Sequence, residues 1–167
     1  MEAERLISIG RGALAESRTA LDIVAEAWQA QALAQAIGGF LALTGPLELR
    51  AEARELSETG GRSGTVDQPV PLPRGVRADR LTRVTDTRGA LLGLGALLGE
   101  VGIALVGVAC GTDEEGLYWQ CVEAIDAADE AGDRVRGLLR RLVARERDRP
   151  PGAGEPWPRL DRMAGPS

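Results

Sequence analysis

One stretch of this chain, residues 85–112, is apolar over almost its whole length. Between Gly89 and Gly111 the only charged side chain is Glu100. A helix that is apolar on all sides must be buried on all sides, so we expect a central helix here, wrapped by the amphipathic segments that precede and follow it. The stretch therefore predicts an architecture, a helical bundle, before it indicates any activity.

The same stretch is long enough to span a bilayer, because a transmembrane helix needs about 20 apolar residues. Two features argue against a membrane. Glu100 would lie at the centre of the bilayer, where a charge is costly, and the flanking amphipathic helices would lose their core. We therefore expect a soluble, buried helix. Within it, Gly95 and Gly99 form a small-xxx-small step, which indicates close contact with a neighbouring helix.

The spacing of apolar residues predicts four main helices, and no convincing period-2 run indicates a strand. The predicted helices span residues 2–44, 46–58, 76–110 and 113–147. Gly45 and Pro46 separate the first two, and Gly111 ends the third. Thr112 and Glu115 match a capping box at the start of the last helix, which makes the last two helices a hairpin. The predicted fold is an all-α, four-helix bundle-like domain.

Two proline-rich stretches fall outside this pattern. Residues 59–75 contain three alternating prolines and predict a flexible linker. Residues 147–167 contain five prolines and no periodic apolar face, so we expect a disordered tail. The expected organisation is one helical domain, residues 1–146, with the linker inside it.

The first predicted helix carries a narrow, alanine-lined seam. Apolar residues recur there every seven positions with alanines beside them: Ile7, Leu14, Leu21 and Trp28, with Ala13, Ala20, Ala27 and Ala34. Small side chains let another helix approach closely, and Gly38 and Gly39 are the natural place for a kink. Near Trp28, the side chains of Gln29, Gln31 and Gln35 form either a polar pocket wall or a solvated flank of the helix.

The composition excludes most familiar active sites. Lysine and histidine are both absent, so the chain has no Schiff-base lysine, no phosphate-binding lysine of a P-loop, no histidine-activated nucleophile and no histidine metal ligand. We expect no cofactor, no metal and no catalytic activity. The net charge of −5 argues against a nucleic-acid partner.

Two cysteines, Cys110 and Cys121, are too few for a secreted disulfide scaffold, and no signal-like segment opens the chain. We expect a cytoplasmic protein, with both cysteines acting as small buried hydrophobic residues rather than as a redox pair. Four carboxylates recur at helical spacing further along the chain: Asp126, Asp129, Glu130 and Asp133. They can in principle hold a hard cation, but a solvated acidic face is the expected interpretation.

Glu100 is the most informative single residue of the apolar stretch. A buried carboxylate needs an arginine partner or shifts its pKa upward. The expected interpretation is an ion pair or a position at a wet edge of the helix. The alternative is a catalytic or ligand-binding role.

Three strings resemble a family of small, uncharacterised actinobacterial proteins. They are AEAWQAQALAQAIG at residues 25–38, LRAEARELSETGG at residues 49–61, and the long run that begins LLGEVGIALVGVACGTDEEGLYWQC at residue 97. The resemblance covers most of residues 1–145, without the linker and the tail. It implies a helical fold and brings no activity with it.

We therefore predict a helical interaction protein that self-associates or binds another protein. The predicted surfaces are the alanine seam and the side chains of Trp28, Tyr118 and Trp119. One alternative is a small-ligand sensor with a pocket between helices near Glu100. Another is an enzyme that uses carboxylates alone.

Overall fold

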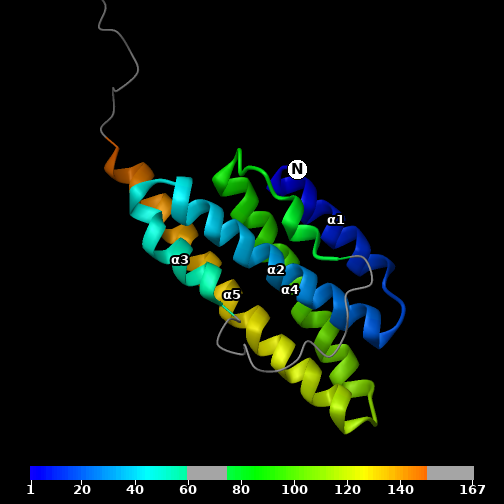
Figure 1. The fold of residues 1–167 in the computed structure, drawn as a ribbon. Coiled ribbons are helices and arrows are strands. Elements are labelled where there is room, and N and C mark those ends of the chain that lie inside the picture. The colour runs from blue at the N-terminus through cyan, green and yellow to red at the C-terminus, as the bar shows by residue number, and fades with distance from the viewer. Residues whose placement is uncertain (60–74, 150–167) are drawn as a thin grey trace, which may run out of the picture.

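The computed structural model describes residues 1–59 and 75–149, which form a bundle of α-helices without a β-strand in these ranges (Figure 1). The helices are α1 (Ala3–Glu16), α2 (Ala20–Thr44), α3 (Arg50–Glu58), α4 (Thr87–Gly111) and α5 (Glu115–Asp148). Two short 3-10 helices, η1 (Leu47–Leu49) and η3 (Arg77–Arg80), lie before α3 and α4. The predicted all-α bundle is confirmed.

All five α-helices bury apolar side chains in one shared core. The largest fully buried side chains come from α2, η1, α3, α4 and α5: Val24, Ile37, Leu41, Leu49, Leu56, Leu91, Leu94, Leu97, Val101, Leu105, Val135 and Leu138. Helix α4 packs against α1, α2 and α5, and α3 packs against α2 and α5.

The predicted first helix, residues 2–44, is in fact two helices. Helix α1 ends after Glu16, where the Ser17 hydroxyl donates to the carbonyl oxygen of Ala13. Helix α2 begins after Thr19, whose Oγ1 accepts a hydrogen bond from the amide of Asp22 at 3.1 Å. Serine and threonine favour helix ends and N-caps, and the break was missed because no glycine or proline marks it.

Gly38 and Gly39 do not kink the chain, because α2 continues through both to Thr44. Gly38 instead lets α3 come close. A Cβ atom at this position would lie 2.6 Å from the backbone nitrogen of Ser57. The alanine seam is likewise used inside the bundle, since Ala27 and Ala34 are buried in the core.

The segment before α4 is also different from the prediction, because the helix expected from residue 76 begins only at Thr87. After η3 the chain is extended and pairs with the N-terminal residues. The amide of Ala3 donates to the carbonyl oxygen of Arg83 at 3.1 Å, and the amide of Thr82 donates to the carbonyl oxygen of Met1 at 3.0 Å. Backbone pairing with a distant segment replaces local helical bonds here, and a periodicity argument does not detect such pairing.

The helix caps differ from the sequence prediction. The N-cap of α4 is Asp86, whose carboxylate accepts a hydrogen bond from the amide of Gly89 at 3.0 Å. At the other end of the hairpin the predicted capping box does not form. Helix α5 begins at Glu115, and the Thr112 hydroxyl accepts from the amide of Glu114 in the preceding turn.

This difference predicts unequal effects of two substitutions. Asp86→Ala should lower the free energy of unfolding by about 0.5–2 kcal/mol, the usual loss for an N-cap. Thr112→Ala should cost less, because its bond lies in an exposed turn outside the helix. Urea denaturation of both variants checks this, and an equal or larger loss for Thr112→Ala would show that the hairpin is capped as the sequence predicts.

The first residues of the predicted linker and of the predicted tail lie at the C-terminal ends of α3 and α5. Thr59, the first residue of the predicted linker, is only 2 % exposed and belongs to the core of the fold. Residues 60–74 lie outside the described residues. The predicted tail begins too early, because α5 continues through Arg147 to Asp148. The rest of the predicted tail, from residue 150, lies outside the described residues.

Candidate interaction surface

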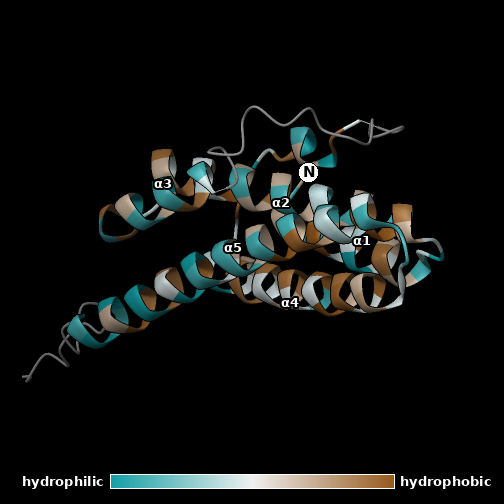
Figure 2. Cartoon of the chain, turned by 90° about the horizontal axis from the view of Figure 1, so that it is seen from below, coloured by the Kyte–Doolittle hydropathy of each residue, from teal (hydrophilic) through white to brown (hydrophobic). Residues whose placement is uncertain are grey.

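Helix α4 is not wrapped on all sides, which corrects the prediction of a fully buried central helix. By length and composition it could cross a membrane, yet only 33 % of its most apolar 18-residue window is buried in the bundle. Figure 2 shows α4 along one edge of the bundle, hydrophobic or neutral over most of its length. Helices α1, α2 and α5 cover its inner side, and among the described helices none covers its outer side.

The exposed side of α4 is a continuous row of apolar and small residues. We call it the outer stripe: Leu92, Ala96, Gly99, Ile103, Val106 and Cys110, all of them exposed. Their spacing alternates between four and three residues, which is the spacing of a coiled-coil seam. Gly99 was predicted to face a close neighbour, but a Cβ atom there would meet nothing within 4 Å. A Cβ atom at Gly95, by contrast, would lie beside Val135.

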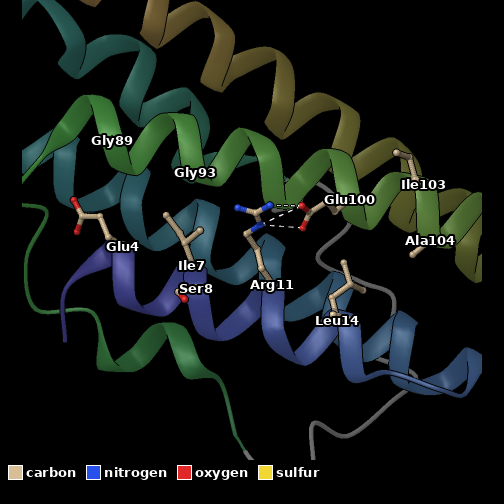
Figure 3. Close-up of a pocket in the computed structure, with 11 residues that line it drawn as sticks. Glu4, Ile7, Ser8, Arg11, Leu14, Gly89, Gly93, Glu100, Ile103 and Ala104 are labelled. Carbon is tan, nitrogen blue, oxygen red and sulfur yellow. Dashed lines mark hydrogen bonds and ion pairs between the residues drawn. The ribbon is translucent and has the colours of Figure 1, made fainter.

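A groove of about 760 Å³ runs along the α1 side of the outer stripe (Figure 3). At its centre Arg11 of α1 reaches Glu100 of α4, with 2.5 Å between Nη2 and Oε1. Hydrogen bonds to Glu100 and then the charge of this carboxylate raise the pKa of the Arg11 guanidinium. Glu100 therefore lies at a wet edge of the helix in an ion pair, the expected one of the two interpretations.

A second groove, of about 450 Å³, lies on the α5 side of the outer stripe near the start of α4. Its apolar lining comes from Leu92, Leu139, Leu142, Val143 and Ala144. Three arginines complete the lining: Arg88, Arg140 and Arg147. We call it the arginine groove. Arg88 is paired with Glu146 at 3.1 Å, so the groove combines apolar surface with the positive charge of Arg140 and Arg147.

The aromatic residues do not form one surface. Tyr118 and Trp119 are exposed in the first turns of α5, with ring centroids 5.3 Å apart in an edge-to-face arrangement. Trp28 is only partly exposed and packs against the core from α2. Tyr118 and Trp119 follow three acidic residues: Asp113, Glu114 and Glu115.

The glutamines of α2 have a structural role that neither sequence interpretation included. Gln31 is buried, and its Nε2 donates to both the carbonyl oxygen and the hydroxyl of Thr59 at 3.2 and 3.1 Å. Gln35 donates to the same carbonyl, while Gln29 bonds Gly75 and the amide of Arg77. Together they hold the chain on both sides of residues 60–74. The sequence showed three glutamines close together on one helix, but it did not indicate which residues they bind.

The remaining candidate groups are dispersed. Within residues 1–59 and 75–149 no cluster of three or more His, Cys, Asp or Glu side chains could hold a metal. Cys121 is buried, and desolvation raises the pKa of its thiol. Cys110 was expected to be buried but is exposed in the outer stripe, because it lies on the open side of α4.

A family model described as a family of unknown function (DUF6099) matches residues 1–141. The chain belongs to this family. The DUF6099 match runs from α1 into α5, and it includes residues 60–74, which the resemblance found in the sequence had left out. No curated protein and no solved structure matches the chain significantly. DUF6099 brings no assigned activity, so function has to be argued from the surface of the bundle.

Proposed function

We propose that this DUF6099 protein is a helical interaction module without catalytic activity, and that the outer stripe of α4 is the surface on which another protein docks. The observation that supports the proposal is the exposure of Ile103 and its neighbours. Ile103 is 77 % exposed, and Leu92 and Val106 are about half exposed on the same side. Contiguous apolar surface on a folded chain is typical of a docking site.

The form of the stripe favours a helix as the docking element. Four-three spacing along α4 forms a straight row of side chains and gaps, and Gly99 near the middle leaves room for close approach. A bilayer fits less well. The Arg11 and Glu100 ion pair flanks the middle of the stripe, so insertion of this face would bring two charges into lipid.

We also propose that the protein is cytoplasmic and does not bind nucleic acid. The net charge of −5 argues against binding to nucleic acid. Arginines near the arginine groove are paired with carboxylates: Arg88 with Glu146, Arg141 with Glu52 and Arg145 with Glu48. They therefore do not form the broad basic face that phosphates require.

One pair of variants tests the docking surface. Ile103→Glu should abolish protein association while leaving the helical content unchanged, because Ile103 is exposed and makes little contact with the core. Leu43→Glu is the matched control, since Leu43 is 79 % exposed but lies on α2, which packs against the inner side of α4. Affinity capture from extracts of the source cells, together with light scattering, measures association. Identical behaviour of the two variants would contradict the proposal.

A small-ligand sensor is the second candidate, because the groove beside Glu100 has a volume in the range of small-molecule sites. It ranks second because Arg11 and Glu100 already satisfy each other, which leaves neither charge free for a ligand. A thermal-shift screen with small molecules, run in parallel on wild type and Glu100→Gln, would detect a ligand that raises the melting temperature of wild type only.

A further inference from the structure

We infer that the partner of the outer stripe is a second copy of this chain, whose α4 packs antiparallel against the first about a two-fold axis beside Gly99 and Ile103. The inference rests on the proposed function, because it names the occupant of that surface. A two-fold interface uses the same patch on both subunits and closes at two copies. The patch must therefore be complementary to itself, and three features of α4 and α5 meet this requirement.

The first feature is the order of large and small residues along the stripe. In the antiparallel register that places Ile103 against Gly99 of the partner subunit, each large side chain faces a small one. The facing pairs are Leu92 with Cys110, Ala96 with Val106, and Gly99 with Ile103. Layers of one large and one small side chain fill the space between two helices without voids or clashes.

A parallel pairing lacks this match. It would place each residue against its own copy, so Ile103 would meet Ile103 and Gly99 would meet Gly99. The layers at Leu92, Ile103 and Val106 would then be bulky and those at Ala96 and Gly99 nearly empty, and both overpacking and cavities are destabilising. The residue sizes therefore favour the antiparallel arrangement.

The second feature is the arginine groove and the aromatic pair at opposite ends of the hairpin. Gly95 of α4 lies beside Val135 of α5, and Leu92 shares the arginine groove with Arg140. Tyr118 is at the other end, near the start of α5. The two-fold axis exchanges these ends, so it brings Tyr118 of the partner subunit level with Arg140.

Tyr118 also lies on the correct side of α5. Arg140 follows it by 22 residues, which is about six turns at 3.6 residues per turn, so both side chains are on the same side of the helix. Arginine above an aromatic ring forms a favourable cation–π contact. Trp119 packs edge-on against Tyr118 and adds apolar area next to this contact.

The third feature is charge. Two arginines of the arginine groove, Arg140 and Arg147 of α5, add positive charge beside the start of α4, whereas Arg88 is paired with Glu146. The opposite end of the hairpin has three consecutive negative residues: Asp113, Glu114 and Glu115. An antiparallel pair places the basic end of each copy against the acidic end of the other, twice. A parallel pair would place acid against acid and arginine against arginine, which costs free energy and slows association.

Light scattering of the purified chain at micromolar concentration tests the occupant. We expect the mass of two chains for wild type and Leu43→Glu, and of one chain for Ile103→Glu. A monomeric wild type that still captures another protein through Ile103 would overturn the inference and leave the proposed function standing. Flotation of wild type with vesicles of phosphatidylcholine and phosphatidylglycerol, lost in Ile103→Glu, would overturn both.

The cysteine of the stripe tests the direction of pairing. In the antiparallel dimer Leu92→Cys faces Cys110 of the partner subunit, so mild oxidation should give a covalent dimer. Wild type should stay uncrosslinked, because positions 92 and 110 are about 27 Å apart along the helix at 1.5 Å per residue and the two Cys110 thiols lie at opposite ends. A disulfide dimer of wild type, or of Leu92→Cys combined with Cys110→Ala, would show parallel pairing and overturn the inference.

The aromatic contact has its own test. Tyr118→Ala should weaken dimerisation at least about tenfold, since a buried aromatic anchor typically contributes this much to an interface. Sedimentation across a dilution series gives the dissociation constant, with Leu43→Ala as the control that leaves it unchanged. An unchanged constant in Tyr118→Ala would overturn the docking of Tyr118 in the arginine groove.

Discussion

Replacing Leu105 with alanine should lower the free energy of unfolding by about 2–5 kcal/mol. Leu105 is fully buried on the inner side of α4. Truncation removes apolar contacts from the core shared by all five helices and leaves a cavity that the bundle can only partly close. Urea denaturation, followed by circular dichroism, measures the loss.

The control is the same chemical change at an exposed helical position. Leu43→Ala should change the free energy of unfolding by less than about 0.5 kcal/mol, because Leu43 is 79 % exposed and buries little surface. If Leu105→Ala lowered the free energy of unfolding only slightly and Leu43→Ala lowered it strongly, Leu105 would not be the buried residue and Leu43 would not be the exposed one.

Gly38→Ala should lower the free energy of unfolding by about 1–3 kcal/mol, although alanine is the better helix former. Its Cβ would lie 2.6 Å from the backbone nitrogen of Ser57 and 2.8 Å from the carbonyl oxygen of Ala53. Both atoms belong to the backbone of α3, so no side chain can rotate away. The two helices would have to separate, which would loosen the α2 and α3 contact.

Its neighbour provides the matched test. Gly39 is in the same helix, and a Cβ there meets nothing within 4 Å. Gly39→Ala should therefore raise stability by up to about 1 kcal/mol, because alanine loses less backbone entropy than glycine. Thermal unfolding of both variants separates the effect of helix propensity from the effect of the α2 and α3 contact. If both variants were stabilised, α3 would not cross α2 at Gly38.

Sequence reasoning predicted helices wherever a local signal was strong. The apolar run of α4, the turn at Gly45 and Pro46, and the periodic face of α5 each depend on neighbouring residues, and each is present in the structure. The break between α1 and α2 was missed because Ser17 and Thr19 give weaker signals than glycine or proline. The late start of α4 was missed because Thr82 and Arg83 pair with the distant N-terminus.

The candidate site residues divided into two groups. Glu100, Tyr118 and Trp119 lie at or near the exposed side of the α4 and α5 hairpin. Gln31 and Gln35 bind Thr59, and Trp28 packs on the core, so these three serve the fold. The sequence of one helix does not indicate which residues its polar and aromatic side chains contact, because those partners are distant in sequence.

Local chemistry in the chain determined that this protein is helical and that it contains neither lysine nor histidine. It did not determine which side of α4 is buried. In amphipathic helices such as α5, the spacing of apolar residues indicates which face is buried. Helix α4 is apolar on all sides, so its sequence does not indicate a buried face. Only the tertiary structure, by placing α1, α2 and α5 on one side of α4, left Leu92, Ile103 and Val106 exposed on the other.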